Sequence, residues 1–203
     1  MKKIISLIAF LILFSCENKK DSKFFKVYDE SELIQKQQEH KNSRMKFKLL
    51  QSKVLDMNEV FKPFNNELAT NFSEEEYNTL KPLILEQNIP SIQQSISKGL
   101  LSYEKLTLFY LYRIRKFESN SNTSLHAIIS LNPLAVEEAR LRDKNRDDNK
   151  FLIDISMYGM PVLIKDNINT AGIPTTAGAI ALLNNKNTED AFIVKRLKEE
   201  GAI

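Results

Sequence analysis

Four consecutive apolar residues, Pro161-Val162-Leu163-Ile164, limit the folds that are open to this chain. Neighbouring side chains of a strand point to opposite faces, so the run predicts a central strand that helices cover on both faces. Lys165 follows the run directly. The strand would carry this lysine to its carboxyl end, where open α/β sheets place their ligand crevices.

The elements around this strand are predicted to alternate between helix and strand. A second apolar run, residues 127–129, is short enough for a strand. Capping residues, glycine stops and the helical spacing of apolar side chains predict four helices. They would begin at Ser91, Ser102, Asn132 and Thr188, and Gly99 and Gly201 would end the first and the last. This order of elements predicts an α/β fold built around a sheet.

Residues 24–88 have a helical pattern and contain no predicted strand. Ser73 and Glu76 fit a capping box, in which the serine oxygen accepts from the third helical amide. The segment carries no catalytic constellation. We expect it to be a helical leader that packs on the main domain, which would span residues 89–203.

The first residues are predicted to be a secretory signal. Lys2 and Lys3 precede an apolar run from Ile4 to Phe14, which is shorter than the roughly 20 residues that cross a bilayer. Leu13-Phe14-Ser15-Cys16 resembles the lipobox of bacterial lipoproteins, in which the cysteine becomes the lipidated N-terminus. The alternative is a general signal peptide that happens to contain a cysteine.

The lipoprotein interpretation predicts where the protein lies in the cell. Residues 1–15 would be removed, and several acyl chains at Cys16 would anchor the protein, because a single chain holds a protein on a membrane only marginally. Residues 16–23 would form a polar tether. The remainder would face the cell envelope of a bacterium, on the periplasmic side or at the surface.

Composition argues against several other classes of protein. The 29 basic and 26 acidic residues give a net charge of +3, and loss of Lys2 and Lys3 would lower it to +1, so no nucleic-acid binding is expected. A single cysteine allows no internal disulfide. His40 and His126 lie far apart in the sequence, and we expect no metal site.

Lys165 has two interpretations. Burial disfavours the ammonium form and lowers the pKa of a lysine, and a neutral amine can act as general base for a serine nucleophile. Alternatively, the side chain extends to solvent or pairs with a carboxylate such as Asp166. The position of the lysine in the sequence leaves both open.

The segment YGMPVLIKDNINTAGIPTTAGAIAL, residues 158–182, resembles the lysine-bearing motif of the amidase signature family. The resemblance runs from about Ile89 to Ile203 and includes GLLSYEKLTLFYLYRI, LHAIISLNPLAVEEA and DAFIVKRLKEEGAI in the family's order. It implies an α/β domain with a mixed central sheet covered by helices. It also implies hydrolysis of a carboxamide, in a small molecule or a peptide, by a triad of serine, cis-serine and lysine, without a cofactor. Lys165 matches the triad lysine.

The resemblance also marks residues near the expected site. The loop with Thr175, Thr176 and Gly178 follows the lysine at the family's spacing and would lie beside the site, although its hydroxyls would also suit the cap of a following helix. The sequence departs from the family at Tyr158-Gly159-Met160, where many members have histidine before the glycine and isoleucine after it.

The two serines of the family's triad have no counterpart in this sequence. In the family they lie in a Gly/Ser-rich loop that would come after residue 203, and none of the five glycines here lies in such a cluster. We therefore expect residues 89–203 to be the N-terminal part of an amidase domain that is inactive alone. Two alternatives are a catalytically dead lipoprotein with a binding or structural role, and a protein similar to the amidase-like component of the amidotransferase that makes glutaminyl-tRNA.

Overall fold

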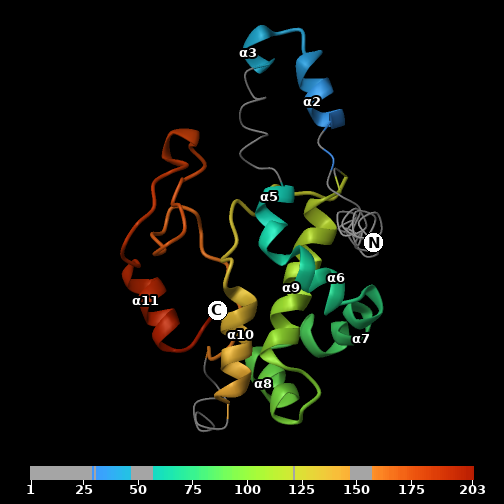
Figure 1. The fold of residues 1–203 in the computed structure, drawn as a ribbon, viewed down its shortest axis with the longest axis vertical. Helices are drawn as coiled ribbons and strands as arrows, with labels where there is room; N and C mark the ends of the chain where they lie inside the picture. The colour runs from blue at the N-terminus through green and yellow to red at the C-terminus, as the bar shows by residue number, and fades with distance from the viewer. Residues whose placement is uncertain (1–28, 30, 47–56, 121, 147–156) are drawn as a thin grey trace, which may run out of the picture.

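The computed structural model describes residues 29, 31–46, 57–120, 122–146 and 157–203. This part of the chain is helical (Figure 1). The α-helices are α2 (Ser31–Gln38), α3 (Ser43–Lys46), α5 (Met57–Phe61), α6 (Asn65–Thr70), α7 (Glu74–Ile84), α8 (Ile89–Ser97), α9 (Tyr103–Glu118), α10 (Ala135–Lys144) and α11 (Phe192–Glu199). Two 3₁₀-helices, η1 (Lys62–Phe64) and η3 (Ile180–Leu182), complete the elements of the described ranges.

The predicted signal sequence, the tether and Cys16 lie outside the described residues. None of the helices in the described ranges is long and apolar enough to cross a membrane.

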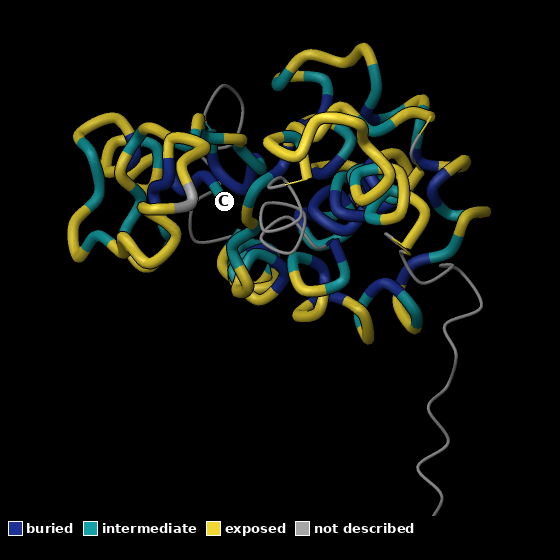
Figure 2. Tube along the Cα trace, turned by 90° about the horizontal axis from the view of Figure 1, so that it is seen from above, coloured by how far each residue is buried: buried dark blue, intermediate teal, exposed yellow. Residues whose placement is uncertain are grey.

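Helix α9 is the centre of the core. It packs against α5, α6, α7 and α10, and its aromatic and aliphatic side chains are buried along most of its length. The buried positions lie inside the molecule and the exposed ones on its outer turns (Figure 2). Tyr103, Phe109 and Tyr112 of this helix are therefore core residues, whereas Phe117 is 38% exposed.

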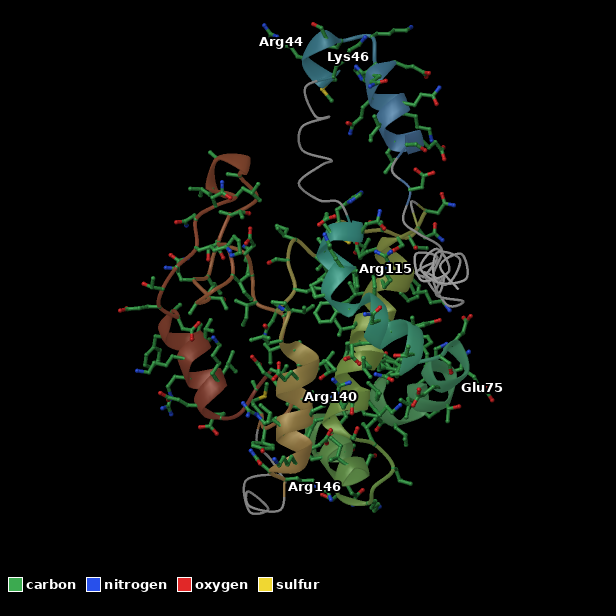
Figure 3. All side chains as sticks on the ribbon, viewed as in Figure 1. Arg44, Lys46, Glu75, Arg115, Arg140 and Arg146 are labelled. Atoms are coloured by element: carbon green, nitrogen blue, oxygen red, sulfur yellow. The ribbon has the colours of Figure 1, made fainter. Side chains whose placement is uncertain are left out.

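Helices α5, α6 and α7 share this core. The ring of Tyr77 from α7 stacks on Phe109 of α9, with centroids 4.7 Å apart, and lies 5.0 Å from the ring of Tyr112. Arg115 of α9 is buried, and its guanidinium donates to the carbonyl oxygen of Met57 at 2.9 Å (Figure 3). Helices α5, α6 and α7 of the expected leader thus pack on α9, whereas α2 and α3 bury no residue. The boundary of the leader at residue 88 stays a prediction.

Several helix ends agree with the predictions. The Ser73 hydroxyl accepts from the amide of Glu76 at 3.0 Å, and the Ser102 hydroxyl accepts from the amide of Lys105 at 3.1 Å. Gly99 and Gly201 follow the last turns of α8 and α11 with positive φ, which favours glycine at helix ends.

Three predicted helix starts are wrong. Helix α8 begins after Asn88, whose side chain accepts from the amide of Ser91, because Pro90 fits inside the first turn. Helix α10 begins at Ala135, since Asn132 caps a preceding turn through the amide of Leu134. Helix α11 begins at Phe192 rather than after Thr188.

The two predicted strands are not assigned in the structure, whose described residues contain an isolated bridge between Pro174 and Lys186. The lysine-bearing run nevertheless pairs at its start. The amide of Ile203 donates to the carbonyl of Met160 at 2.9 Å, and the amide of Val162 donates to the carbonyl of Ile203 at 2.8 Å. This is the bonding pattern of one parallel step, and a strand needs a longer ladder of such bonds. The mixed sheet therefore stays a prediction.

Candidate active site

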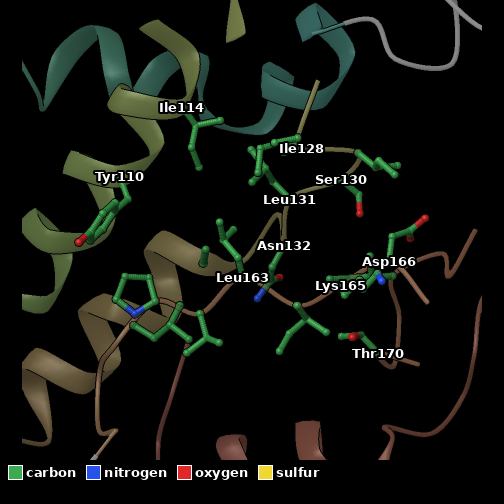
Figure 4. Close-up of a pocket in the computed structure, with 18 of the residues that line it drawn as sticks. Tyr110, Ile114, Ile128, Ser130, Leu131, Asn132, Leu163, Lys165, Asp166 and Thr170 are labelled. Atoms are coloured by element: carbon green, nitrogen blue, oxygen red, sulfur yellow. The ribbon is translucent and has the colours of Figure 1, made fainter. Parts of the chain in front are cut away.

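A cleft of about 1610 Å³ lies between α9 and the C-terminal segments. One wall is formed by α9 and by residues 127–135, and the other by residues 161–168 and 170–175. Figure 4 shows Lys165 and Asp166 across this cleft from Tyr110 and Ile114 of α9. The cleft combines mainly apolar walls with a few polar groups, which is typical of sites for small molecules.

Lys165 lies on the cleft wall and is exposed. Within the described part of the chain its ammonium has no hydrogen-bond or ion-pair partner. The expected dry surroundings of this amine are therefore not formed by the described residues. The alternative pairing of Lys165 with Asp166 is not formed between these two described side chains either.

Asp166 instead binds the loop that follows. Its carboxylate accepts from the amide of Thr176 at 3.1 Å, from the amide of Gly178 at 3.2 Å and from the Thr176 hydroxyl. Its carbonyl oxygen accepts from the amide of Ala177 at 2.9 Å. Burial raises the pKa of this carboxyl, but the hydrogen bonds from Thr176, Gly178 and Ala177 outweigh burial and hold the pKa below its ordinary value.

The residues bound by Asp166 form a tight turn. The amide of Ala179 donates to the carbonyl of Thr176 at 2.8 Å, and the two residues between them, Ala177 and Gly178, have φ of +49° and +76°. Two central residues at positive φ are characteristic of a type I′ turn. The Thr176 hydroxyl holds this turn rather than capping a helix.

Thr175 joins this turn to residues 185–187 by hydrogen bonds. Its amide donates to the carbonyl of Asn185 at 3.0 Å, and its hydroxyl accepts from the side chain of Asn187 at 2.9 Å. Thr175 and Thr176 are both buried. Thr175, Gly178 and Lys165 line the cleft, and Thr176 lies behind the lining.

The opposite wall depends on a buried carboxylate at the end of α9. Glu118 is 6% exposed, and its side chain accepts from the Ser124 hydroxyl at 2.7 Å and from the amide of His126 at 3.0 Å. These bonds set the path of the chain into residues 127–131, which line the cleft. The sequence interpretation missed this role.

Tyr158 occupies the position where many amidase signature proteins have histidine, and here it packs in the core. Its ring meets Tyr103 edge-on, with centroids 5.5 Å apart. Its carbonyl accepts from the buried side chain of Gln93 at 2.9 Å, and Gln93 in turn accepts from the Tyr103 hydroxyl at 2.8 Å. Burial raises the pKa of the Tyr103 phenol, so that this donor keeps its proton. The network seats the lysine-bearing segment on α8 and α9.

Asp190 holds the loop between Lys165 and α11 through contacts with Ala171 and Lys198. Its carboxylate accepts from the amide of Ala171 at 2.7 Å and pairs with Lys198 at 2.8 Å. No group of three His, Cys, Asp or Glu side chains in the described ranges is arranged to hold a metal ion.

The structure places most of the predicted site residues, and their expected roles stay predictions. Lys165, Thr175 and Gly178 line the cleft together and Thr176 lies behind its lining, whereas Cys16 lies outside the described residues. Asp166 was considered only as an ion-pair partner of the lysine. An aspartate near a Thr-Thr-Ala-Gly turn is a signal for its actual role, because aspartate side chains accept readily from turn amides.

Part of the chain is similar to known amidases. Residues 105–203 match the family model described as Amidase. A probable amidase of Arabidopsis thaliana is 39% identical over 122 residues, which are 59% of this chain and 23% of the relative. A glutamyl-tRNA(Gln) amidotransferase component of Nitratidesulfovibrio vulgaris is 34% identical over 116 residues, 57% of this chain and 22% of that protein.

Two solved structures resemble this one. An amidase family protein from Bacillus anthracis has a TM-score of 0.64 at 39% identity, covering 72% of this chain and 28% of that chain. A peptide amidase in complex with the competitive inhibitor chymostatin has a TM-score of 0.53 at 37% identity, covering 59% and 24%. The chain therefore spans about a quarter of the length of the proteins that it matches.

Proposed function

We propose, from the match of residues 105–203 to the Amidase family model, that the protein hydrolyses carboxamides with Lys165 as the proton-transferring amine. The substrate would be a small molecule or a peptide amide, since a similar structure is that of a peptide amidase bound to a competitive inhibitor. The observation that carries the proposal is a lysine without a partner among the described residues, on the wall of a large cleft inside the matched region.

The proposed chemistry uses the triad that the family resemblance implies. A serine oxygen attacks the carboxamide carbon, and its proton passes through the cis-serine to the neutral amine of Lys165. The resulting ammonium returns the proton to the leaving nitrogen as the C–N bond breaks. Water then hydrolyses the acyl-serine by the same route in reverse.

The exposure of Lys165 sets a requirement for this mechanism. An amine takes up the serine proton only when it is neutral, and exclusion of water favours the neutral form. We propose that the serine-bearing loop and the substrate together cover the cleft and exclude water from Lys165. These 203 residues contain no Gly/Ser-rich loop and are expected to be inactive by themselves.

We further propose that the protein acts at the cell envelope, anchored through acyl chains on Cys16. The support is the predicted signal and the lipobox-like sequence before Cys16. Metabolic labelling with a radioactive fatty acid tests this anchor. Label in the wild type that is lost in C16S is expected, and label in neither protein would contradict it.

An amidotransferase function is the second candidate, because glutamyl-tRNA(Gln) amidotransferase components are similar over the same region. Such a component works in the cytoplasm as part of a complex with other chains, as the family resemblance implies. The predicted secretory signal argues against this candidate. A catalytically dead lipoprotein remains the alternative if no amide is hydrolysed.

The test of the proposed function is amide hydrolysis by the protein expressed from its complete open reading frame. K165A is expected to abolish release of ammonia from simple amides and peptide amides. Lys195 of α11 is an exposed lysine outside the cleft lining, and K195A is the matched control that keeps activity. Wild-type activity in K165A would move the base to another residue.

A further inference from the structure

We propose that Asp166 is a positioning residue for the amide hydrolysis, which holds the Thr176–Gly178 turn and Lys165 in a fixed relation. This inference rests on the proposed function of Lys165. Asp166 acts through its neighbours and is not required to touch the substrate.

The first argument is the number of bonds that converge on this residue. The carboxylate and the carbonyl oxygen of Asp166 together accept from three successive amides, those of Thr176, Ala177 and Gly178, and from the Thr176 hydroxyl. Bonds to an ionised carboxylate are stronger than those between neutral groups. The low pKa of this carboxyl agrees with such a set of donors.

The second argument is the conformation of the turn. Ala177 has a φ of +49° although it carries a Cβ, and such a conformation persists where the surrounding contacts fix it. The contacts that fix it here come from Asp166, ten residues earlier in the sequence than Thr176. Without the carboxylate, the amide of Thr176 would lose its acceptor, and the amide of Gly178 would keep only the Thr176 hydroxyl as an acceptor.

The third argument is the position of Asp166 next to Lys165. Asp166 is bonded covalently to Lys165, and both residues line the cleft together with Ala177 and Gly178. Adjacent Cα atoms are about 3.8 Å apart, so a movement of Asp166 displaces the backbone that carries the lysine. Because the turn occupies the carboxylate, the ammonium of Lys165 also stays unpaired among the described residues.

A different explanation is that Asp166 only stabilises the loop. Asp190 provides the comparison, because its carboxylate also accepts an amide hydrogen of this loop, from Ala171, yet Asp190 does not line the cleft. A purely structural role predicts that replacing either aspartate changes stability and turnover in the same way. A positioning role predicts that only Asp166 affects turnover.

The experiment measures kcat, KM and the melting temperature of D166N and D190N, in protein expressed from the complete open reading frame. D166N is expected to lower kcat by roughly 10²-fold with little change in KM, because a displacement of about 1 Å costs that much in turnover. D190N is expected to lower the melting temperature and to keep kcat. Hydrogen exchange at the amide of Gly178 should accelerate in D166N and not in D190N.

Thr176 supplies a rescue test. T176S keeps the hydroxyl that donates to Asp166 and is expected to keep kcat, whereas T176V removes this donor and should lower kcat. Two results would overturn the role of Asp166: wild-type kcat in D166N, or equal losses of kcat in D166N and D190N. An inactive wild type would instead refute the proposed function, and the role of Asp166 with it.

Discussion

Replacing Gly159 by alanine tests how the lysine-bearing segment is seated on α9. Gly159 has a φ of +70°, and a Cβ placed there would lie 2.1 Å from Cδ1 of Tyr103. The Tyr103 ring is fully buried, donates through its hydroxyl to Gln93 at 2.8 Å and packs edge-on against Tyr158. The ring therefore cannot move away without breaking these contacts.

Gly99 is a matched control for this change, because its φ is +73° and a Cβ there would meet nothing within 4 Å. In both alanine variants, the left-handed conformation lowers the free energy of unfolding by about 1–2 kcal/mol. Both substitutions also restrict the unfolded chain to the same extent. Overpacking against the ring costs G159A about 1–3 kcal/mol more. We expect unfolding free energies lower by about 1–2 kcal/mol in G99A and by about 2–5 kcal/mol in G159A.

Urea denaturation followed by circular dichroism measures both losses. The midpoint should fall further in G159A than in G99A, with an unchanged slope, because the surface exposed on unfolding is the same. Equal losses in the two variants would show that the Tyr103 ring does not confine the backbone at Gly159. The proposed packing of the segment that leads to Lys165 against α9 would then be wrong.

Three further predictions concern charge and exposed surface. Arg140 forms ion pairs with Glu67 and Glu104 at 2.7 and 2.9 Å, and its side chain is 41% exposed. R140A should therefore lower the free energy of unfolding by about 1 kcal/mol or less, as measured by urea denaturation. This loss should be smaller in about 1 M salt, which screens exposed charges. Despite the opposing effect of burial, the folded pKa of Asp166 lies below its unfolded value, so its contribution to stability is present above about pH 4 and lost as the pH falls through the folded pKa. Acid titration of unfolding should therefore show the difference between wild type and D166N shrinking below about pH 4, and a difference that grows there would contradict this sign. Leu163 is 72% exposed, so L163S should change the free energy of unfolding by no more than about 0.5 kcal/mol in urea denaturation, and a loss of about 2 kcal/mol or more would show that this side chain is buried.

Local signals predicted the helix ends that depend on local bonds. The Ser73 and Ser102 caps need only the amide three residues later, so the sequence alone was sufficient. Asn88 and Ser91 compete for the start of α8, and the conformation that Pro90 prefers selects Asn88. Asp190 could have capped α11 together with Thr188, but it accepts from the distant amide of Ala171 instead.

At the site too, the sequence predicted features that depend on neighbouring residues, but not the contacts between residues that are distant in the sequence. The apolar run predicted Lys165 at the end of a strand, which is not assigned in the described residues, and the family resemblance predicted that the loop with Thr175, Thr176 and Gly178 lies beside the site. The bonds from Asp166 to the turn join residues that are ten or more positions apart, which no capping rule covers. Pairing of residues 160–162 with Ile203 is equally non-local, and one parallel step does not define a sheet.

Chemical rescue of K165A tests the central claim, that an amine on the cleft wall transfers the proton. Lys165 is exposed in the cleft, so a small primary amine such as ethylamine should have access to the vacated position. In protein expressed from the complete open reading frame, we expect K165A to be inactive. Its hydrolysis rate should then rise with the concentration of unprotonated ethylamine, while K195A shows no such response. Full activity of K165A without the amine, or lost activity that no amine restores, would contradict the account.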